Sequence, residues 1–178
     1  MFVLIGMVVM KQRILLLGVI GLLLIICILF IPYQKVLSFT YQDQDDLLAY
    51  LPLSETDTLQ IQFTHSIHLS SVVDTYTLKD QKIIQTELSF EDFAVGMPSN
   101  AEGEEIFEVK DGRYYLSNMN REFPFIDLRV GQVRADHKVV YEGRTYQLSN
   151  YIKPGEWVRI SSKNFSIWQK LKGVNISG

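Results

Sequence analysis

A long apolar segment near the N-terminus constrains this chain more than any other feature. Residues 14–31, with the sequence ILLLGVIGLLLIICILFI, carry no charged side chain. An α-helix of this length extends about 27 Å, close to the roughly 30 Å of hydrocarbon in a bilayer. The sequence therefore predicts one transmembrane anchor.

The charges on either side of this segment predict its orientation. Lys11 and Arg13 precede it, whereas Lys35 alone follows it closely and acidic residues come next. Positive charge is retained on the cytoplasmic side of a membrane. We therefore expect a single-pass protein of the cell membrane with an extracytoplasmic C-terminal domain. The predicted divisions are a cytoplasmic N-terminus (1–13), the anchor (14–31), a tether (32–57) and an extracytoplasmic β-domain (58–178).

A cleaved secretory signal is the alternative interpretation. Signal sequences have an apolar region of about 7–15 residues that ends in a small-x-small site. The run here is longer, and residues 31–40 contain no Ala-x-Ala pattern, so we expect the anchor to stay uncleaved. Cys27 follows Ile26 rather than a small residue, which argues against lipid attachment. Met10, directly before Lys11, is an alternative start of the chain.

The composition after the anchor limits the class of the exported domain. About 140 residues remain, the size of one domain, and Cys27 is the only cysteine, so no intrachain disulfide can form. All 20 Asp and Glu lie after residue 40, against 14 of the 17 Lys and Arg, a balance of −6. This acidic balance argues against a nucleic-acid partner and against a polybasic contact with anionic lipid.

Two kinds of pattern follow the anchor. Residues 32–57 are polar and contain Pro52, which is typical of a tether with at most one helical turn, at Asp45 to Leu51. From Thr58 onward apolar and polar residues alternate, as in half-buried strands. The dipeptides that predict tight hairpins are Asp80-Gln81, Asp111-Gly112 and Glu142-Gly143.

Short strands with regular turn signals predict an all-β fold, either an antiparallel β-sandwich or a small barrel, outside the membrane. Residues 164–172 are predicted to form a terminal amphipathic helix or one added strand.

Two polar residues interrupt apolar strand faces. His65 continues the face of Ile61 and Phe63, and Asp74 lies on the face of Tyr76. A polar group on an apolar face is costly unless it is satisfied, so we predict that His65 contacts Asp74, with Ser66 or Tyr76 nearby. An imidazole bonded to a carboxylate supports general-base catalysis, but it also locks strands together. Ser66 points to the opposite face, so no nucleophile accompanies the pair.

Metal sites are weakly indicated. His65 and His68 are three residues apart and would need a turn to converge on zinc. Acidic residues are frequent in residues 87–111, yet their spacing matches no calcium loop. We therefore predict no metal and no cofactor.

Residues 93–103 form a loop rich in small residues. It lacks a Gly-Lys-Ser/Thr sequence, which argues against a nucleotide site. We predict that it packs over the His65 end of the sheet and forms the rim of the main concave surface, although it is alternatively a plain connection. The candidate binding residues in this loop are Phe93, Gly96, Met97, Pro98 and Asn100.

Three short motifs carry a resemblance. Phe63-Thr64-His65-Ser66, Asp74-x-Tyr76 and Phe93-x-x-Gly96-Met97-Pro98 resemble the sparse motif set of DUF1850, a bacterial family of small exported domains with no assigned function. The resemblance covers roughly residues 58–160. Members of the family commonly carry Glu at the position of Asp74. The resemblance implies a frequent genomic link to TRAP-type solute transporters of the TAXI class, and no known activity.

Three function classes remain open. The first is a binding or accessory module, for a TRAP-type transporter subunit or for an unknown small-molecule ligand. The second is a hydrolase-like enzyme that uses His65 and Asp74. The third is a purely structural cell-surface protein. The anchor, the acidic exterior and the missing nucleophile favour the first class, so we do not expect an enzyme.

Overall fold

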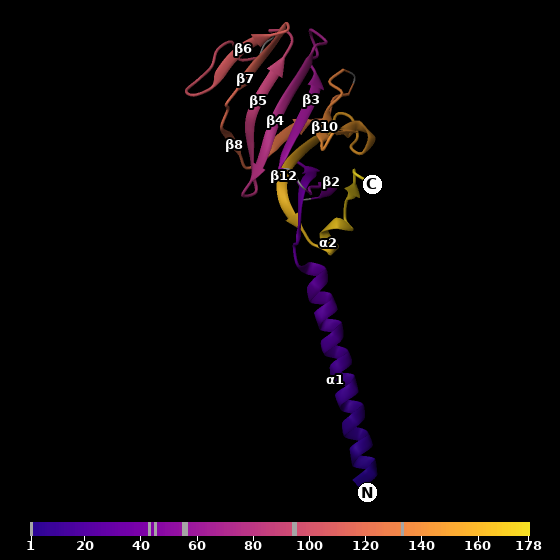
Figure 1. Cartoon of the computed structure of the whole chain (residues 1–178). Coiled ribbons are helices and arrows are strands. Elements are labelled where there is room, and N and C mark those ends of the chain that lie inside the picture. Colours follow the sequence, from indigo (N-terminus) through magenta and orange to yellow (C-terminus); the bar gives the residue numbers. More distant parts are fainter. Residues whose placement is uncertain (1, 43, 45, 55–56, 94–95, 133) are drawn as a thin grey trace.

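The computed structural model consists of an N-terminal helix followed by two β-sheets that pack against each other (Figure 1). It describes residues 2–42, 44, 46–54, 57–93, 96–132 and 134–178. The prediction of an all-β domain behind one apolar helix is confirmed, and among the described strands neither sheet closes into a barrel.

The helices and strands follow one another without long gaps in the first half of the chain: α1 (Phe2–Phe30), β1 (Gln34–Tyr41), β2 (Leu47–Pro52), β3 (Thr58–Thr64), β4 (Ser71–Lys79) and β5 (Lys82–Phe90). The second half contains β6 (Ile106–Lys110), β7 (Arg113–Ser117), β8 (Arg121–Phe123), β9 (Ile126–Arg129), β10 (Lys138–Tyr141), β11 (Arg144–Gln147), η1 (Leu148–Asn150), β12 (Trp157–Phe165), α2 (Ile167–Lys170) and β13 (Val174–Asn175).

The helix α1 contains the predicted membrane segment. Its stretch Gln12–Phe30 is long and apolar enough to cross a membrane, either as a retained anchor or as a signal sequence. The helix ends two residues before Pro32, because the residue before a proline is biased away from helical geometry. The chain then enters β1 at Gln34.

The first sheet has the strand order β13-β2-β1-β12-β9. Its central strand β1 pairs with β12 along its whole length, from Gln34 opposite Phe165 to Tyr41 opposite Val158. The prediction of a tether over residues 32–57 is therefore wrong. Five successive residues of β1 are buried, so the strand shows no alternation, and β2 replaces the predicted helical turn. Asp45, where that turn was predicted to begin, lies outside the described residues.

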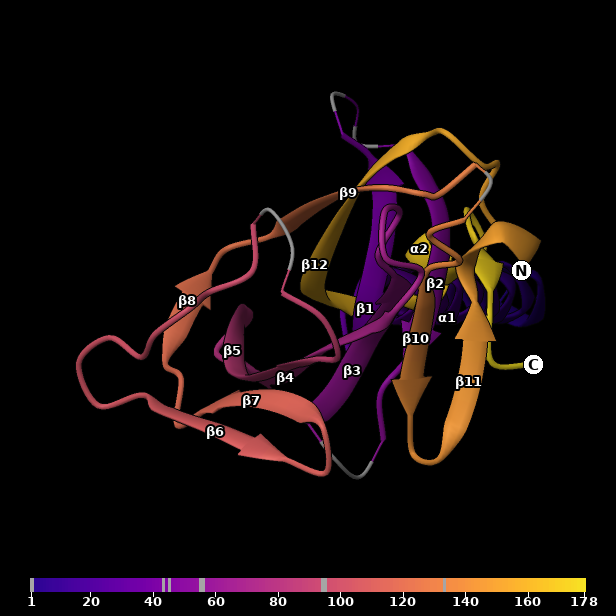
Figure 2. The same cartoon turned by 90° about the horizontal axis from the view of Figure 1, so that it is seen from above.

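The second sheet has the order β11-β10-β3-β4-β5-β7-β6, and β8 pairs with β5. Its three two-residue hairpins lie at the predicted dipeptides, where both residues have positive φ: Asp80 and Gln81, Asp111 and Gly112, and Glu142 and Gly143. Such φ values are those of type I′ turns, whose twist matches that of the strands. Viewed along α1, the β6–β7 and β10–β11 hairpins lie on opposite sides of the domain (Figure 2).

Three clusters of buried apolar residues stabilise the described part of the domain, and the smallest consists of Val36, Tyr50 and Phe165. The main cluster lies between the sheets and includes the fully buried Phe39, Leu51, Leu78 and Ile160. A second cluster belongs to the second sheet alone and consists of Val72, Leu88, Phe90, Leu116 and Met119. Each such side chain contributes roughly 1.5–3 kcal/mol by burial. Because the second cluster has no partner sheet above it, other chain segments must cover it.

Candidate functional site

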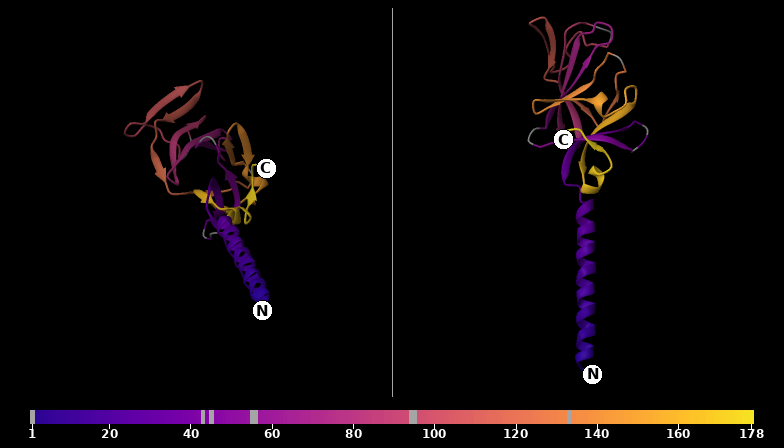
Figure 3. Two further views of the ribbon diagram at one scale, coloured as in Figure 1. Left: turned by 60° about the horizontal axis from the view of Figure 1, so that its bottom comes forward. Right: turned by 90° about the vertical axis from the view of Figure 1, so that its right-hand side faces the viewer.

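The strands β3, β5 and β6 end together on the side of the second sheet that is turned away from α1 (Figures 1 and 3). The register places Thr64 opposite Ser71, Val72 opposite Phe90, and Phe90 opposite Tyr114. We call this region the distal end and define it as the turn 65–70, the described part of the loop 91–105, and residues 109–113 at the tip of the β6–β7 hairpin. It brings together two of the three motifs found in the sequence.

His65 leaves the strand and starts a tight turn at the distal end. Its N–H donates to the Ser70 carbonyl oxygen at 2.8 Å, and its own carbonyl oxygen accepts from the Leu69 N–H at 2.9 Å. The His65 Nδ1 accepts a long hydrogen bond of 3.4 Å from the Ile67 N–H. Ser66 is exposed in this turn. His65 is therefore a turn residue and not the last inward residue of β3.

The histidines do not assemble a metal site in the part of the chain that the structure describes. The His65 and His68 rings are 5.8 Å apart between centroids, but within the described ranges no third His, Cys, Asp or Glu joins them to form a group that could hold a metal ion. His137 stacks on Phe63 at 5.5 Å, and its Nδ1 accepts from the Gly131 N–H at 3.1 Å. Burial lowers the pKa of His137.

Asp74 lies in the middle of the sheet, away from His65. The register places it opposite Ile61 on β3, four residues before His65, which is roughly 13 Å along a strand. The predicted His65–Asp74 contact is therefore wrong. The partner of Asp74 is Gln85, whose Nε2 donates to Oδ1 at 2.6 Å from the neighbouring strand β5.

The Asp74 carboxyl is the strongly perturbed acid of this sheet. Burial raises its pKa to about 6, although the hydrogen bond from Gln85 acts in the opposite direction. Burial, together with the negative charge of Asp74, also raises the pKa of Tyr76. Asp74, Tyr76 and Gln85 thus form an inner polar cluster in which Asp74 is the acid with the raised pKa. Within the described residues Asp74 belongs to no group of His, Cys, Asp or Glu that could hold a metal ion, and Ser66 lies at the distal end.

The loop after β5 covers the second apolar cluster. The Phe93 ring lies 4.3 Å from the Tyr114 ring and 5.5 Å from the Phe90 ring, between centroids. Met97 packs against the same cluster as Phe63 of β3. The loop therefore packs at the end of the sheet where His65 lies, as predicted. Ala94 and Val95, which belong to the predicted loop, lie outside the described residues.

The remaining candidate residues of the loop have local roles. Gly96 has a φ of +95°, a conformation that side-chain-bearing residues rarely adopt. Pro98 is half-buried, and the exposed Asn100 accepts a hydrogen bond from Ser99 Oγ at 3.3 Å.

Two arginines, which sequence reasoning missed, fix the two ends of this loop. Arg113 Nη1 pairs with Glu91 at 2.8 Å, and its Nη2 donates to the Ser71 carbonyl oxygen at 3.2 Å. Arg121 donates from Nε and Nη2 to the two carboxylate oxygens of Glu105, at 2.9 and 3.1 Å. Bidentate pairs of this kind are geometrically specific. Two of the acidic residues in the segment 87–111, Glu91 and Glu105, therefore hold the loop in place.

Exposed apolar side chains gather at the distal end. Ile67 and Leu69 in the turn are 69% and 57% exposed, Phe93 in the loop is 44% exposed, and Val109 at the end of β6 is 62% exposed. Val109 pairs directly with Tyr114, the residue against which the Phe93 ring packs. Clustered apolar exposure marks interaction surfaces. The sequence signal was the apolar pair in a turn, Ile67 and Leu69.

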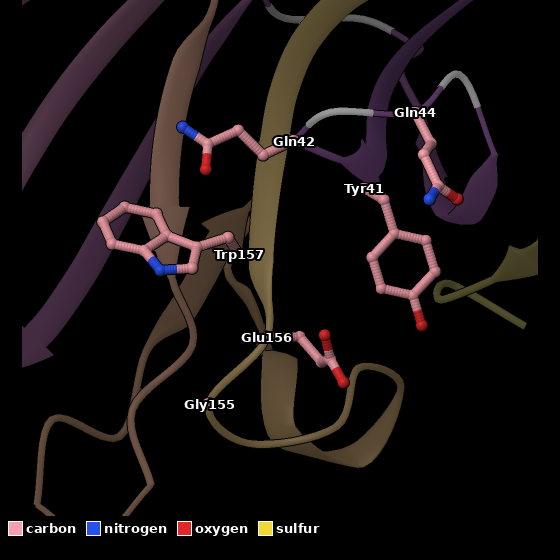
Figure 4. Close-up of a pocket in the computed structure, with 6 residues that line it drawn as sticks. All are labelled: Tyr41, Gln42, Gln44, Gly155, Glu156 and Trp157. Carbon is pink, nitrogen blue, oxygen red and sulfur yellow. The ribbon is translucent and has the colours of Figure 1, made fainter.

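Three surface cavities lie away from the loop 96–103 and from His65. A cavity of about 340 Å³ opens beside Tyr41 and Trp157 (Figure 4), and one of about 450 Å³ opens beside Lys35. A third, of about 320 Å³, lies beside Glu87 and reaches Lys110 and Asp111 of the β6–β7 turn. These three cavities are lined by neither the loop 96–103 nor His65, so they give no support to the predicted concave rim.

The first of these cavities is not a convergent site. In Figure 4 Trp157 lies on one side of the strand that carries it, whereas Tyr41 and Glu156 lie on the other side. Gln42 is already engaged, since its Nε2 donates to Asp127 at 3.0 Å. The side chains therefore do not surround one ligand position.

Comparison with known proteins gives one family. The family model described as a domain of unknown function (DUF1850) matches residues 59–148. No curated protein and no solved structure matches the chain. The matched range runs from β3 to β11 and contains the second sheet, both motifs of the distal end and the Asp74 cluster, but not β1, β2 or β12. The match covers half of the chain, and the protein therefore belongs to the DUF1850 family.

Proposed function

We propose that this protein is a membrane-anchored binding module that engages a partner protein through the distal end. The observation that carries the proposal is that Phe63 of the first motif and Met97 of the third pack against one apolar cluster, although they are far apart in the sequence. Both lie within the family match, and exposed apolar side chains surround them.

A protein partner suits this surface better than a small molecule. Small-molecule sites are concave and enclose their ligand, whereas the distal end presents side chains that project from turns. Two arginine–glutamate pairs fix the ends of the loop 91–105. The loop therefore loses little conformational entropy when a partner binds. Phe93 and Val109 are the anchor candidates, because apolar and aromatic residues at an interface centre dominate affinity.

The anchor is part of the proposal. We propose that α1 remains attached and holds the domain outside the cell membrane, with the N-terminus inside. Only residues 31–33 separate α1 from β1, where Val36 and Phe39 are fully buried. Cleavage within residues 35–40 would cut the central strand of the first sheet. The family resemblance makes a TRAP-type transporter the partner to test first.

The test uses the full-length chain, co-expressed with candidate transporter subunits and purified from membranes. Leu69→Asp and Val109→Asp place charges on the distal end, and each is expected to reduce co-purification by at least about tenfold, or 1.4 kcal/mol. Trp157→Asp is the matched control, because Trp157 is 47% exposed but lies outside the distal end. Unfolding midpoints of the three variants verify that each remains folded.

Two results would overturn the proposal. One is unchanged co-purification of a bound subunit in both distal variants. The other is that a photo-cross-linker at position 109 captures no protein in native membranes while the same probe at position 157 does. A hydrolase that uses His65 and Asp74 would need the two side chains in contact, whereas the register separates them by roughly 13 Å along the strand.

A further inference from the structure

A second group of exposed apolar side chains lies where α1 meets the domain. Trp168 is 46% exposed, Leu171 is 74% exposed and Tyr33 is 59% exposed. The Trp168 ring contacts the ring of Phe30, the last residue of α1, with 5.8 Å between centroids. Figures 1 and 3 show α2 at the base of the domain, beside the end of α1.

Strand pairing places these residues at the membrane end of the fold. Gln34 at the start of β1 lies opposite Phe165 at the end of β12, and the Tyr33 N–H donates to the Phe165 carbonyl oxygen at 3.1 Å. The chain then turns at once into α2. Ser166 caps this turn, since its Oγ accepts from the Gln169 N–H at 3.2 Å and its own N–H donates to Gln169 Oε1 at 2.9 Å.

Two lysines accompany the aromatic rings. Lys170 Nζ donates to the Tyr33 hydroxyl at 3.0 Å and to Gln34 Oε1 at 2.8 Å, and it lies 5.2 Å from the centre of the Tyr33 ring. Lys172 Nζ lies 5.9 Å from the centre of the Trp168 ring. Aromatic rings at headgroup level, with lysines whose charged ends reach water, are typical of a membrane–water interface.

We propose that Tyr33, Trp168, Lys170, Leu171 and Lys172 form a membrane seat that lies in the interfacial layer of the outer leaflet. The occupant is the bilayer that α1 crosses. Phe30 ends the membrane-crossing stretch Gln12–Phe30, so a ring in contact with it lies at the edge of the hydrocarbon. The inference rests on α1 remaining attached. It gives the domain one orientation, with the distal end away from the membrane.

The chain supplies its own pair of reporters. Its two tryptophans, Trp157 and Trp168, are 47% and 46% exposed. Trp157 begins the nine-residue strand β12, which is about 30 Å long, and Trp168 lies three residues beyond the end of that strand. Trp157→Phe leaves only the proposed seat fluorescent, and Trp168→Phe leaves only the control position. The two variants therefore differ in position and hardly in exposure.

The experiment reconstitutes both full-length variants in phosphatidylcholine vesicles that carry a nitroxide at a chosen depth of the lipid. Trp168 is expected to lose at least about half of its emission with the label near the headgroup, as befits an interfacial aromatic residue. Trp157 emission should be unchanged. Aqueous iodide should show the reverse order and quench Trp157 more strongly.

The seat is refuted if Trp168 and Trp157 respond alike to the lipid label. It is equally refuted if iodide quenches Trp168 in vesicles as strongly as Trp157, because the ring is then in water or against another protein. A second variant checks the apolar contact: Leu171→Glu, combined with Trp157→Phe, should reduce the lipid quenching of Trp168. Unchanged quenching in that variant contradicts insertion of Leu171. Far-ultraviolet circular dichroism confirms that each variant is folded.

Discussion

Replacing Asp74 with asparagine tests whether the charged Asp74 carboxylate in the second sheet lowers the free energy of unfolding. Asp74 lies between Ile61 on β3 and Leu88 on β5, and its hydrogen-bond partner is the neutral amide of Gln85. The asparagine side chain keeps an oxygen at the position that accepts this hydrogen bond. The substitution therefore removes the buried charge while the pairing with Gln85 remains.

The sign follows from the direction of the shift. Burial raises the pKa of Asp74 from 3.8 to about 6, so the folded state binds the proton more tightly than the unfolded chain does. The stability that this proton contributes is present below pH 4, is lost between pH 4 and 6, and is absent above pH 6. The difference between the folded and unfolded pKa values of Asp74 lowers the free energy of unfolding by about 3 kcal/mol at pH 8.

Asp74→Asn should therefore raise the free energy of unfolding by about 2–3 kcal/mol at pH 8. The lower figure allows for the new amide N–H₂, which needs an acceptor or water. At pH 4 the carboxyl of the folded protein is already protonated and carries no charge penalty, so the gain should fall below about 1 kcal/mol. Urea unfolding of the full-length protein in a mild detergent, followed by tryptophan emission, measures both values.

Asp127→Asn is the control with the opposite sign. The hydrogen bond from Arg159 lowers the pKa of Asp127, so its charge stabilises the folded state above pH 4. Because this pair is partly exposed, the loss at pH 8 should stay below about 1 kcal/mol. Equal effects of Asp74→Asn at both pH values, or a larger destabilisation at pH 8, would show that Asp74 is not a buried, charged group.

Two further predictions concern the N-terminal half. Phe39→Ala, in the fully buried centre of β1, should lower the free energy of unfolding by about 3–5 kcal/mol in the same urea assay, whereas a tether residue would change it by less than about 1 kcal/mol. The mass of the protein extracted from membranes should include residues 14–31, near the full-length 20.5 kDa or shorter by residues 1–9; a mature chain that begins at residue 33 or later would contradict the retained anchor.

Local signals predicted the second sheet well and the first sheet poorly. Hairpins such as Asp111-Gly112 need only two residues with positive φ, a property that the dipeptide itself reveals. β1 is instead buried on both faces, since Leu37 and Phe39 pack in the main cluster between the sheets while Val36, on the opposite face, packs in a separate cluster. A strand of this kind has no alternation, and the neighbouring Pro52 and acidic residues made the segment resemble a linker.

Predicting the candidate site would have required the pairing register of the strands, and the alternation of apolar and polar residues does not reveal that register. Alternation placed Asp74 on the inward face, yet it could not show that Asp74 lies opposite Ile61 while His65 enters a turn. The loop prediction fared better, because Met97 and Phe93 are apolar residues that need burial wherever the loop passes. The Arg113–Glu91 and Arg121–Glu105 pairs join segments 16 to 22 residues apart, and charge counts do not identify such partners.

The membrane seat and the distal end together determine how far above the membrane the partner must bind. The strand β5 begins near the base of the domain, runs roughly along the axis of α1 in Figures 1 and 3, and ends at the distal end. Its nine residues extend about 30 Å. With the membrane seat in the headgroup layer, the distal end therefore stands at least that far from the hydrocarbon. An extracytoplasmic domain of a transporter reaches this height, whereas its membrane-embedded surface does not, so cross-links from position 109 should map to such a domain.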